Sequence, residues 1–259
     1  MLRNVFTKTL WDQRRSLGWW AAGLLAVIAV YVAPYRQYLE QGVLVGNTDS
    51  PLYEALGYDP SPAGYLQGTL FALTGPLLAI MAAATAGARA VAGDEEAGTL
   101  ELLLAHPVSR TQLVTQRFAA LTATCAWLGL VLWAGTLAAA RVADLGVGVG
   151  PVTAATAGLV LLSLGFGAVA LAAGALVGRR ALVLGVTAAL AVGAYLAWTV
   201  GSQVDALGPV KRLSPFWWYL GGDPLRTGLD AGHLALLAAV PLALLGVTLW
   251  AMGRRDVAV

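Results

Sequence analysis

The chain has 259 residues, of which 58 % are hydrophobic and only 12 % are charged. Soluble domains carry about 25 % charged residues, and a folded chain of this length has too little interior to hide so much apolar surface from water. The single cysteine, Cys125, also excludes an intrachain disulfide. The composition therefore excludes an ordinary soluble domain and favours a protein whose solvent is lipid.

Six intervals free of Asp, Glu, Lys and Arg are long enough to cross the bilayer core, which takes about 20 helical residues. Ala, Leu, Val and Gly dominate these intervals, without the alternation of polar and apolar residues that a membrane β-barrel needs. The sequence therefore predicts an all-α integral membrane protein with one transmembrane domain over residues 1–259. The expected spans are about 17–35, 64–90, 112–140, 151–178, 181–203 and 232–252.

Basic residues set the expected orientation, because Lys and Arg are retained on the cytoplasmic side of short loops. With the N-terminus inside, eleven basic residues are cytoplasmic and five (Arg36, Arg141, Lys211, Arg212 and Arg226) are external. Both termini are therefore expected in the cytoplasm (N-in/C-in). This topology accounts for the net charge of +2 without a nucleic-acid partner.

The first residues carry an amphipathic pattern. Leu2, Phe6, Leu10 and Leu17 share one helical face, and the basic side chains lie elsewhere. This pattern predicts an N-terminal amphipathic helix on the cytoplasmic membrane surface. The alternative is a solvated stub before the first span.

The spans lack the side chains that several membrane chemistries need. The six uncharged intervals that define them hold no Asp, Glu, Lys or Arg, and His106 and His233 are the only histidines of the chain. An ion relay and intramembrane metal hydrolysis are therefore disfavoured, and no bound metal or cofactor is expected. Neither Lys8 nor Lys211 stands in a phosphate-binding loop G-x-x-x-x-G-K-[ST]. If transport is active, another polypeptide must supply the energy.

The stretch between the second and third spans has its own helix signals. Thr99 can cap a short helix with Glu101 in its first turn, and Pro107 disfavours helical geometry just before it. Ser109 and Gln112 form a capping box that starts the third span. The leucines of this short helix need a partner or the lipid surface. The alternative is a solvated acidic loop whose leucines lie on lipid.

This same stretch resembles a known family signature. It reads Asp94-Glu95-Glu96-Ala97-Gly98-Thr99-Leu100-Glu101-Leu102-Leu103 and then Pro107-Val108-Ser109-Arg110, like the cytoplasmic segment between the second and third helices of ABC-2 type transporter permeases. A second segment, SPFWWYLGGDPL from Ser214 to Leu225, is similar to one before the last helix of many members. The external loop at 36–62 is short, so members with large extracellular domains are poor guides.

The resemblance implies a permease subunit of an ATP-binding cassette exporter in the plasma membrane. It implies a cytoplasmic coupling helix that docks on a separate ATPase, with two ATPase copies holding ATP and magnesium, and a second permease copy, expected to form a homodimer. The chain itself is then not an enzyme. The residues assigned to ATPase coupling are Asp94, Glu95, Glu96, Gly98, Thr99, Leu100, Glu101, Leu103, Leu104, Pro107 and Arg110.

The aromatic run before the last span is a second candidate site. Phe216, Trp217, Trp218 and Tyr219 are expected at the outer membrane interface, where aromatic side chains concentrate. They are interpreted as an external gate, and the alternative is a passive aromatic belt.

Two other functions compete with the exporter. One is a membrane-embedded lipid-modifying enzyme, disfavoured by the missing catalytic cluster, and the other is a non-transporting scaffold or sensor subunit of the same fold. The uncharged spans favour lipid-like or amphiphilic cargo over a hydrated ion, and the Arg-rich composition suggests a bacterial protein.

The topology is testable by cysteine labelling on a background in which Cys125 is replaced. We expect a membrane-impermeant thiol reagent applied to intact cells to reach cysteines at positions 49 and 223, but not at position 96. Labelling at position 96 in intact cells would contradict the N-in/C-in orientation.

Overall fold

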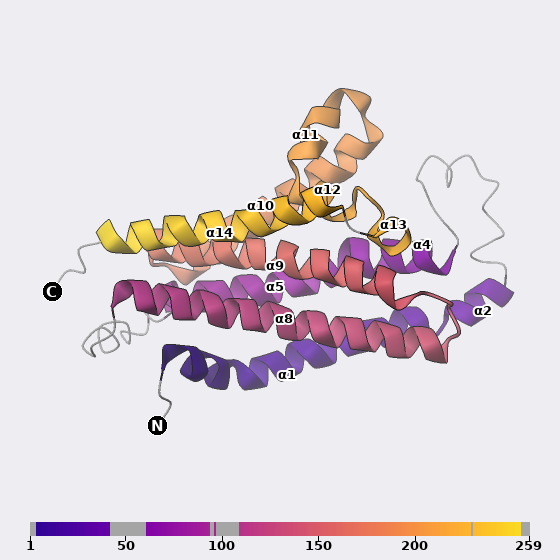
Figure 1. Cartoon of the computed structure of the whole chain (residues 1–259), viewed down its shortest axis with the longest axis horizontal. Coiled ribbons are helices and arrows are strands. Elements are labelled where there is room, and N and C mark those ends of the chain that lie inside the picture. Colours follow the sequence, from indigo (N-terminus) through magenta and orange to yellow (C-terminus); the bar gives the residue numbers. More distant parts are fainter. Residues whose placement is uncertain (1–3, 42–60, 94–95, 97–108, 229, 255–259) are drawn as a thin grey trace.

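The computed structural model describes residues 4–41, 61–93, 96, 109–228 and 230–254, and these residues form a bundle of helices without strands (Figure 1). Six helical segments are long and apolar enough to cross a membrane: Val5–Tyr38, Pro62–Gly93, Arg110–Val142, Val149–Val177, Arg180–Gln203 and Ala231–Gly253. The six expected spans are confirmed as apolar helices.

Four of the six spans are single helices. The first span comprises α1 (Val5–Val32) and α2 (Tyr35–Glu40), and the second comprises α4 (Pro62–Leu66), η1 (Gln67–Thr74), α5 (Gly75–Ala88) and η2 (Arg89–Gly93). The other spans are α8 (Arg110–Val142), α9 (Val149–Val177), α10 (Arg180–Gln203) and α14 (Ala231–Arg254). Between the last two lie η3 (Asp205–Leu207), α11 (Gly208–Leu213), α12 (Pro215–Leu220) and α13 (Pro224–Thr227).

Successive spans run in opposite directions. The start of α1 and the end of α14 therefore lie at one end of the bundle, and α2, α4, α11, α12 and α13 lie at the other (Figure 1). We refer to these as the terminal end and the distal end. Which end faces the cytoplasm stays a prediction from the basic residues.

The N-terminal segment differs from the expectation of a separate surface helix. Residues 5–17 are the first turns of α1, which continues unbroken to Val32. The start of α1 instead lies against α8: Val5 and Thr9 are buried, and the Phe6 backbone N–H donates to Gln116 Oε1 at 3.2 Å. Only Gly18 interrupts the helix-forming sequence at this point, and one exposed glycine does not end a helix.

Helix α9 forms the centre of the bundle. It contacts α5, α8, α10 and α14, and it buries the largest share of its residues. It approaches α5 closely where Gly87 faces Gly167. A Cβ on Gly87 would collide with the Gly167 carbonyl oxygen and lie 3.1 Å from the Ala170 Cβ. Small residues thus let two helix backbones meet at a distance that larger side chains forbid.

The second span, expected over about 64–90, is not a uniform α-helix. Segment η1 is π-helical, and at its end the Gly75 N–H donates to the carbonyl of Leu70, five residues earlier. The next residue, Pro76, has no N–H and its ring displaces the carbonyl four residues before it, so the α-helical pattern cannot continue there. The π-helical segment η1 thus lets the chain pass Pro76 without ending the second span.

The outer surface of the bundle is apolar. Large side chains on α10, among them Leu182, Leu190 and Leu196, are about half exposed, and Trp19 on α1 is 80 % exposed. In water such a surface would aggregate. It fits a bundle surrounded by hydrocarbon.

The close contact between α5 and α9 predicts that adding one methyl group at Gly87 lowers the stability of the fold. Gly87→Ala places a Cβ against the Gly167 carbonyl and should destabilise the fold by about 1–3 kcal/mol through overpacking. Gly185→Ala on α10 is the matched control, because nothing lies within 4 Å of its Cβ position. Thermal unfolding in detergent, followed by circular dichroism, compares them. Equal stability of the two variants would mean that α5 and α9 do not depend on this approach.

Candidate functional site

A cavity lies between the second and fifth spans. Its volume is about 420 Å³, and we name it the α5–α10 cavity. Side chains of η1 and α5 form one wall, and side chains of α10 from Leu184 to Tyr195 form the other. Phe216 of α12 also lines it. The lining is almost wholly apolar and includes Leu73, Pro76, Leu77, Ile80, Met81, Ala84, Ala188, Ala191 and Val192.

An aromatic cluster packs around Phe216. The Phe216 ring meets Tyr195 edge-on with ring centroids 5.3 Å apart, and it lies 6.1 Å from the ring of Phe166. Tyr195 also contacts Trp198, at 5.7 Å. Rings from α9, α10 and α12 thus hold one another in place next to the cavity. Such pairs add to the stability gained from burial alone.

The two threonines of the lining present no free donor to the cavity. The Thr85 hydroxyl donates to the Ala82 carbonyl at 2.9 Å, and the Thr187 hydroxyl donates to the Val183 carbonyl at 2.8 Å. Both hydroxyls are satisfied within their own helices. Among the described residues, no Asp, Glu, Lys or Arg lines the cavity, so this lining suits a hydrocarbon group and not an ion.

The structure divides the four predicted gate residues into two pairs. Phe216 and Tyr219 are buried, whereas Trp217 and Trp218 are half-buried. The Trp218 indole N–H donates to the Arg212 carbonyl at 2.8 Å, and the Trp217 ring meets His233 edge-on at 4.6 Å. The four residues lie on one six-residue helix at the distal end, and Phe216 alone of them lines the α5–α10 cavity.

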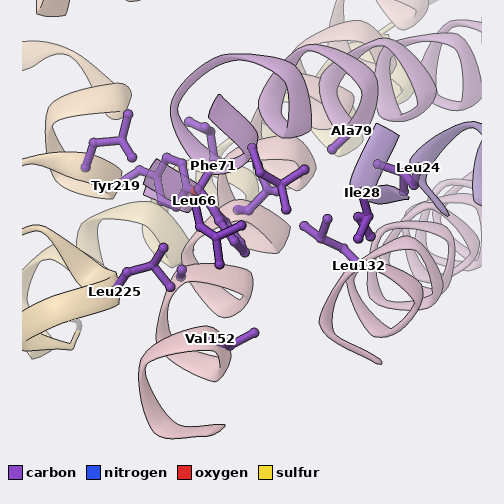
Figure 2. Packing of buried hydrophobic residues seen from close by; sticks show 14 of the residues in the cluster. Leu24, Ile28, Leu66, Phe71, Ala79, Leu132, Val152, Tyr219 and Leu225 are labelled. Carbon is purple, nitrogen blue, oxygen red and sulfur yellow. The ribbon is translucent and has the colours of Figure 1, made fainter. Parts of the chain in front are cut away.

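Tyr219 belongs to the packed core. Its side chain enters the same cluster as Leu66, Phe71 and Val152 (Figure 2). Its hydroxyl has no hydrogen-bond partner among the described residues, and burial raises the pKa of this phenol well above its ordinary value. The phenol therefore keeps its proton at physiological pH.

Two of the predicted coupling residues are described. The Glu96 Oε1 accepts a hydrogen bond from the Arg180 backbone N–H at 2.9 Å, and the Arg110 Nη1 donates to the Met252 carbonyl at 3.1 Å. These contacts are made with the first residue of α10 and the last turns of α14, both at the terminal end. Asp94, Glu95, Gly98, Thr99, Leu100, Glu101, Leu103, Leu104 and Pro107 lie outside the described residues.

The start of the third span follows the capping signal. Ser109 is the N-cap of α8, and its hydroxyl accepts from the Gln112 backbone N–H at 3.1 Å. This half of the expected capping box is confirmed.

Sequence reasoning missed the cavity and its aromatic neighbours. Tyr195 and Phe166 lie on different spans, and only packing brings them around Phe216. One signal was available, because Pro76 inside an apolar interval marks a break in α-helical bonding.

The described residues contain no group of three or more His, Cys, Asp or Glu side chains that could hold a metal ion. Six apolar spans, with α9 at their centre, and an apolar cavity define a multi-pass membrane protein. Residues 3–257 match the ABC-2 family transporter proteins, and the chain belongs to this family. Its membrane components are ordinarily not enzymes. No curated protein matches the chain.

The placement of the aromatic run predicts unequal costs of truncation. Phe216→Ala should destabilise the protein by about 3–5 kcal/mol, because it removes a buried ring beside an existing cavity. Trp218→Ala should cost less, because that side chain is only half-buried. Thermal unfolding of both purified variants in detergent measures the difference. A larger loss for Trp218→Ala would contradict the inward position of Phe216.

Proposed function

We propose that the chain is the permease subunit of an ATP-binding cassette exporter in a bacterial plasma membrane. Two copies would form the pathway, and two separate cytoplasmic ATPase subunits would bind ATP and magnesium. The observation that carries this proposal is membership of the ABC-2 transporter family over residues 3–257.

The segment 94–110 is the proposed contact with the ATPase. It follows η2 and precedes α8, so a displacement of this segment reaches the second and third spans through the chain itself. The bond between Arg110 and the Met252 carbonyl extends the connection to α14. Approach of the ATPases on binding ATP would then shift the population between two arrangements of the spans, driven by differential nucleotide binding.

The cavity supports an amphiphilic or lipid-like cargo. Leu73, Leu77, Met81 and Val192 line it and are themselves about half exposed at the surface of the bundle. The cavity is therefore continuous with the surface that faces hydrocarbon in the proposed setting. A cargo with an apolar group could reach it from the membrane without crossing water, and Phe216 would limit its passage at the distal end.

The ATPase contact predicts two disruptive substitutions. Leu103→Asp or Glu101→Arg should release the ATPase without unfolding the permease. A leucine seated in a partner groove contributes about 1.5–3 kcal/mol, and an unpaired buried carboxylate costs several kcal/mol more. Together they should weaken association by at least a hundredfold. Pull-down of the co-purifying ATPase by detergent-solubilised variants measures this loss.

The matched control for this experiment is Leu213→Asp. Leu213 is 76 % exposed on α11 at the distal end, so the same chemical change there should leave ATPase binding intact. Full retention of the ATPase by both coupling variants would place the contact on another segment. An ATPase that binds the wild-type chain, but drives no export of amphiphiles in vesicles, would favour the scaffold or sensor function.

A further inference from the structure

Glu96 makes a contact that spans 84 positions of the sequence. Helix α10 begins after a two-residue link, Gly178 and Arg179, and no side chain of that link caps it. The Arg180 backbone N–H, at the first position of α10, instead donates to Glu96 Oε1 at 2.9 Å. The cap of the fifth span is thus supplied by the residue that stands three positions after the end of η2.

The physics of helix ends favours this contact. The first N–H groups of a helix have no partner within the helix, and the N-terminus carries a partial positive charge. A carboxylate satisfies both conditions. Glu96 comes from another part of the chain, so its bond also connects the end of the second span to the start of the fifth. A cap from a neighbouring residue would not make this connection.

The surrounding packing holds the two partners in register. Ala88, Ala92 and Val183 belong to one buried cluster that joins α5, η2 and α10. Gly174 of α9 leaves room for this cluster, because its Cβ position lies 3.5 Å from the Ala92 backbone nitrogen and 3.7 Å from the Ala92 Cβ. Small residues again permit a close approach, here at the terminal end.

Helix α10 buries few of its own residues. Most of its residues are exposed on the outer surface, and only Val183, Thr187 and Gly201 are buried. Between Leu184 and Tyr195 it forms a wall of the α5–α10 cavity. A displacement of its first turn would therefore act on a helix that forms one wall of the cavity.

We infer that Glu96 is the positioning residue that transmits displacement of the ATPase-contacting segment to α10. This inference rests on the proposed function, because that function supplies the displacement. Glu96 here acts within the permease and does not itself hold the ATPase.

The cap is tested on the purified full chain by amide hydrogen exchange. Glu96→Ala should increase exchange at the start of α10, residues 180–184, at least tenfold. Glu96→Gln keeps an acceptor oxygen and should remain close to wild type. The matched control is Asp12→Ala, which removes an exposed carboxylate from α1 and should change nothing in α10. Unchanged exchange in Glu96→Ala would overturn the inference.

A second experiment separates the two roles of Glu96, capping α10 and connecting the second span to α10. In Glu96→Ala/Arg179→Ser, a serine at the N-cap position restores a local cap, since the backbone of residue 179 is already extended (φ −112°, ψ 109°). Val192→Cys, in a Cys125→Ser background, carries a fluorophore at the cavity wall of α10. The change in fluorescence on adding ATP is measured in the complex with the co-purifying ATPase. This change should occur in the labelled chain with Glu96 and in the labelled Glu96→Gln variant. The double variant should regain amide protection at the start of α10 but should show no change in fluorescence.

Three results distinguish failure of the inference from failure of the proposed function. A full ATP response in the double variant would show that Glu96 is only a cap. Loss of ATPase binding in Glu96→Ala would show that Glu96 is a contact residue and not a link. A wild-type chain that recruits no ATPase would overturn the proposed function, and the inference with it.

Discussion

The approach of α5 to α9 at Gly87 and Gly167 is the contact on which the arrangement of the spans depends. In hydrocarbon the hydrophobic effect gives no preference for helix association, so van der Waals contact between backbones has to supply it. Gly167 also receives the Leu121 side chain of α8, whose Cδ1 lies 2.9 Å from the Cβ position of that glycine. One short stretch of α9 thereby fixes the positions of two neighbouring spans.

Backbone groups inside such a bundle have no water to bond, so their partners have to come from the protein itself. The second span shows how this is done where its α-helical pattern fails. The Thr74 hydroxyl donates to the Thr69 carbonyl at 3.1 Å, and the Tyr31 hydroxyl lies 3.0 Å from the Thr74 hydroxyl. Tyr65 in turn donates to the Tyr31 carbonyl at 3.0 Å. The irregular segment is thus bonded to α1 and remains compatible with an apolar environment.

Composition was enough to predict the six spans, because each needs only an uncharged apolar run of sufficient length. The N-cap at Ser109 was also predictable, since a cap depends on neighbouring residues alone. The continuity of α1 was not, because the apolar face of its first turns fits a lipid surface and a neighbouring helix equally well. The cavity and the bond between Glu96 and Arg180 depend on contacts between distant segments, which no local pattern encodes. Of the remaining coupling residues, only Arg110 has a described position.

The length of α8 has a consequence for the membrane itself. Its 33 residues extend about 50 Å at about 1.5 Å per residue, while the hydrocarbon core of a bilayer is about 30 Å thick. The helix therefore either tilts steeply or projects into the headgroup region, and its partner α1, with 28 residues, faces the same mismatch. The tilt of this pair then responds to bilayer thickness. Lipids with longer or shorter acyl chains would therefore change the angle between these two helices and the bilayer normal.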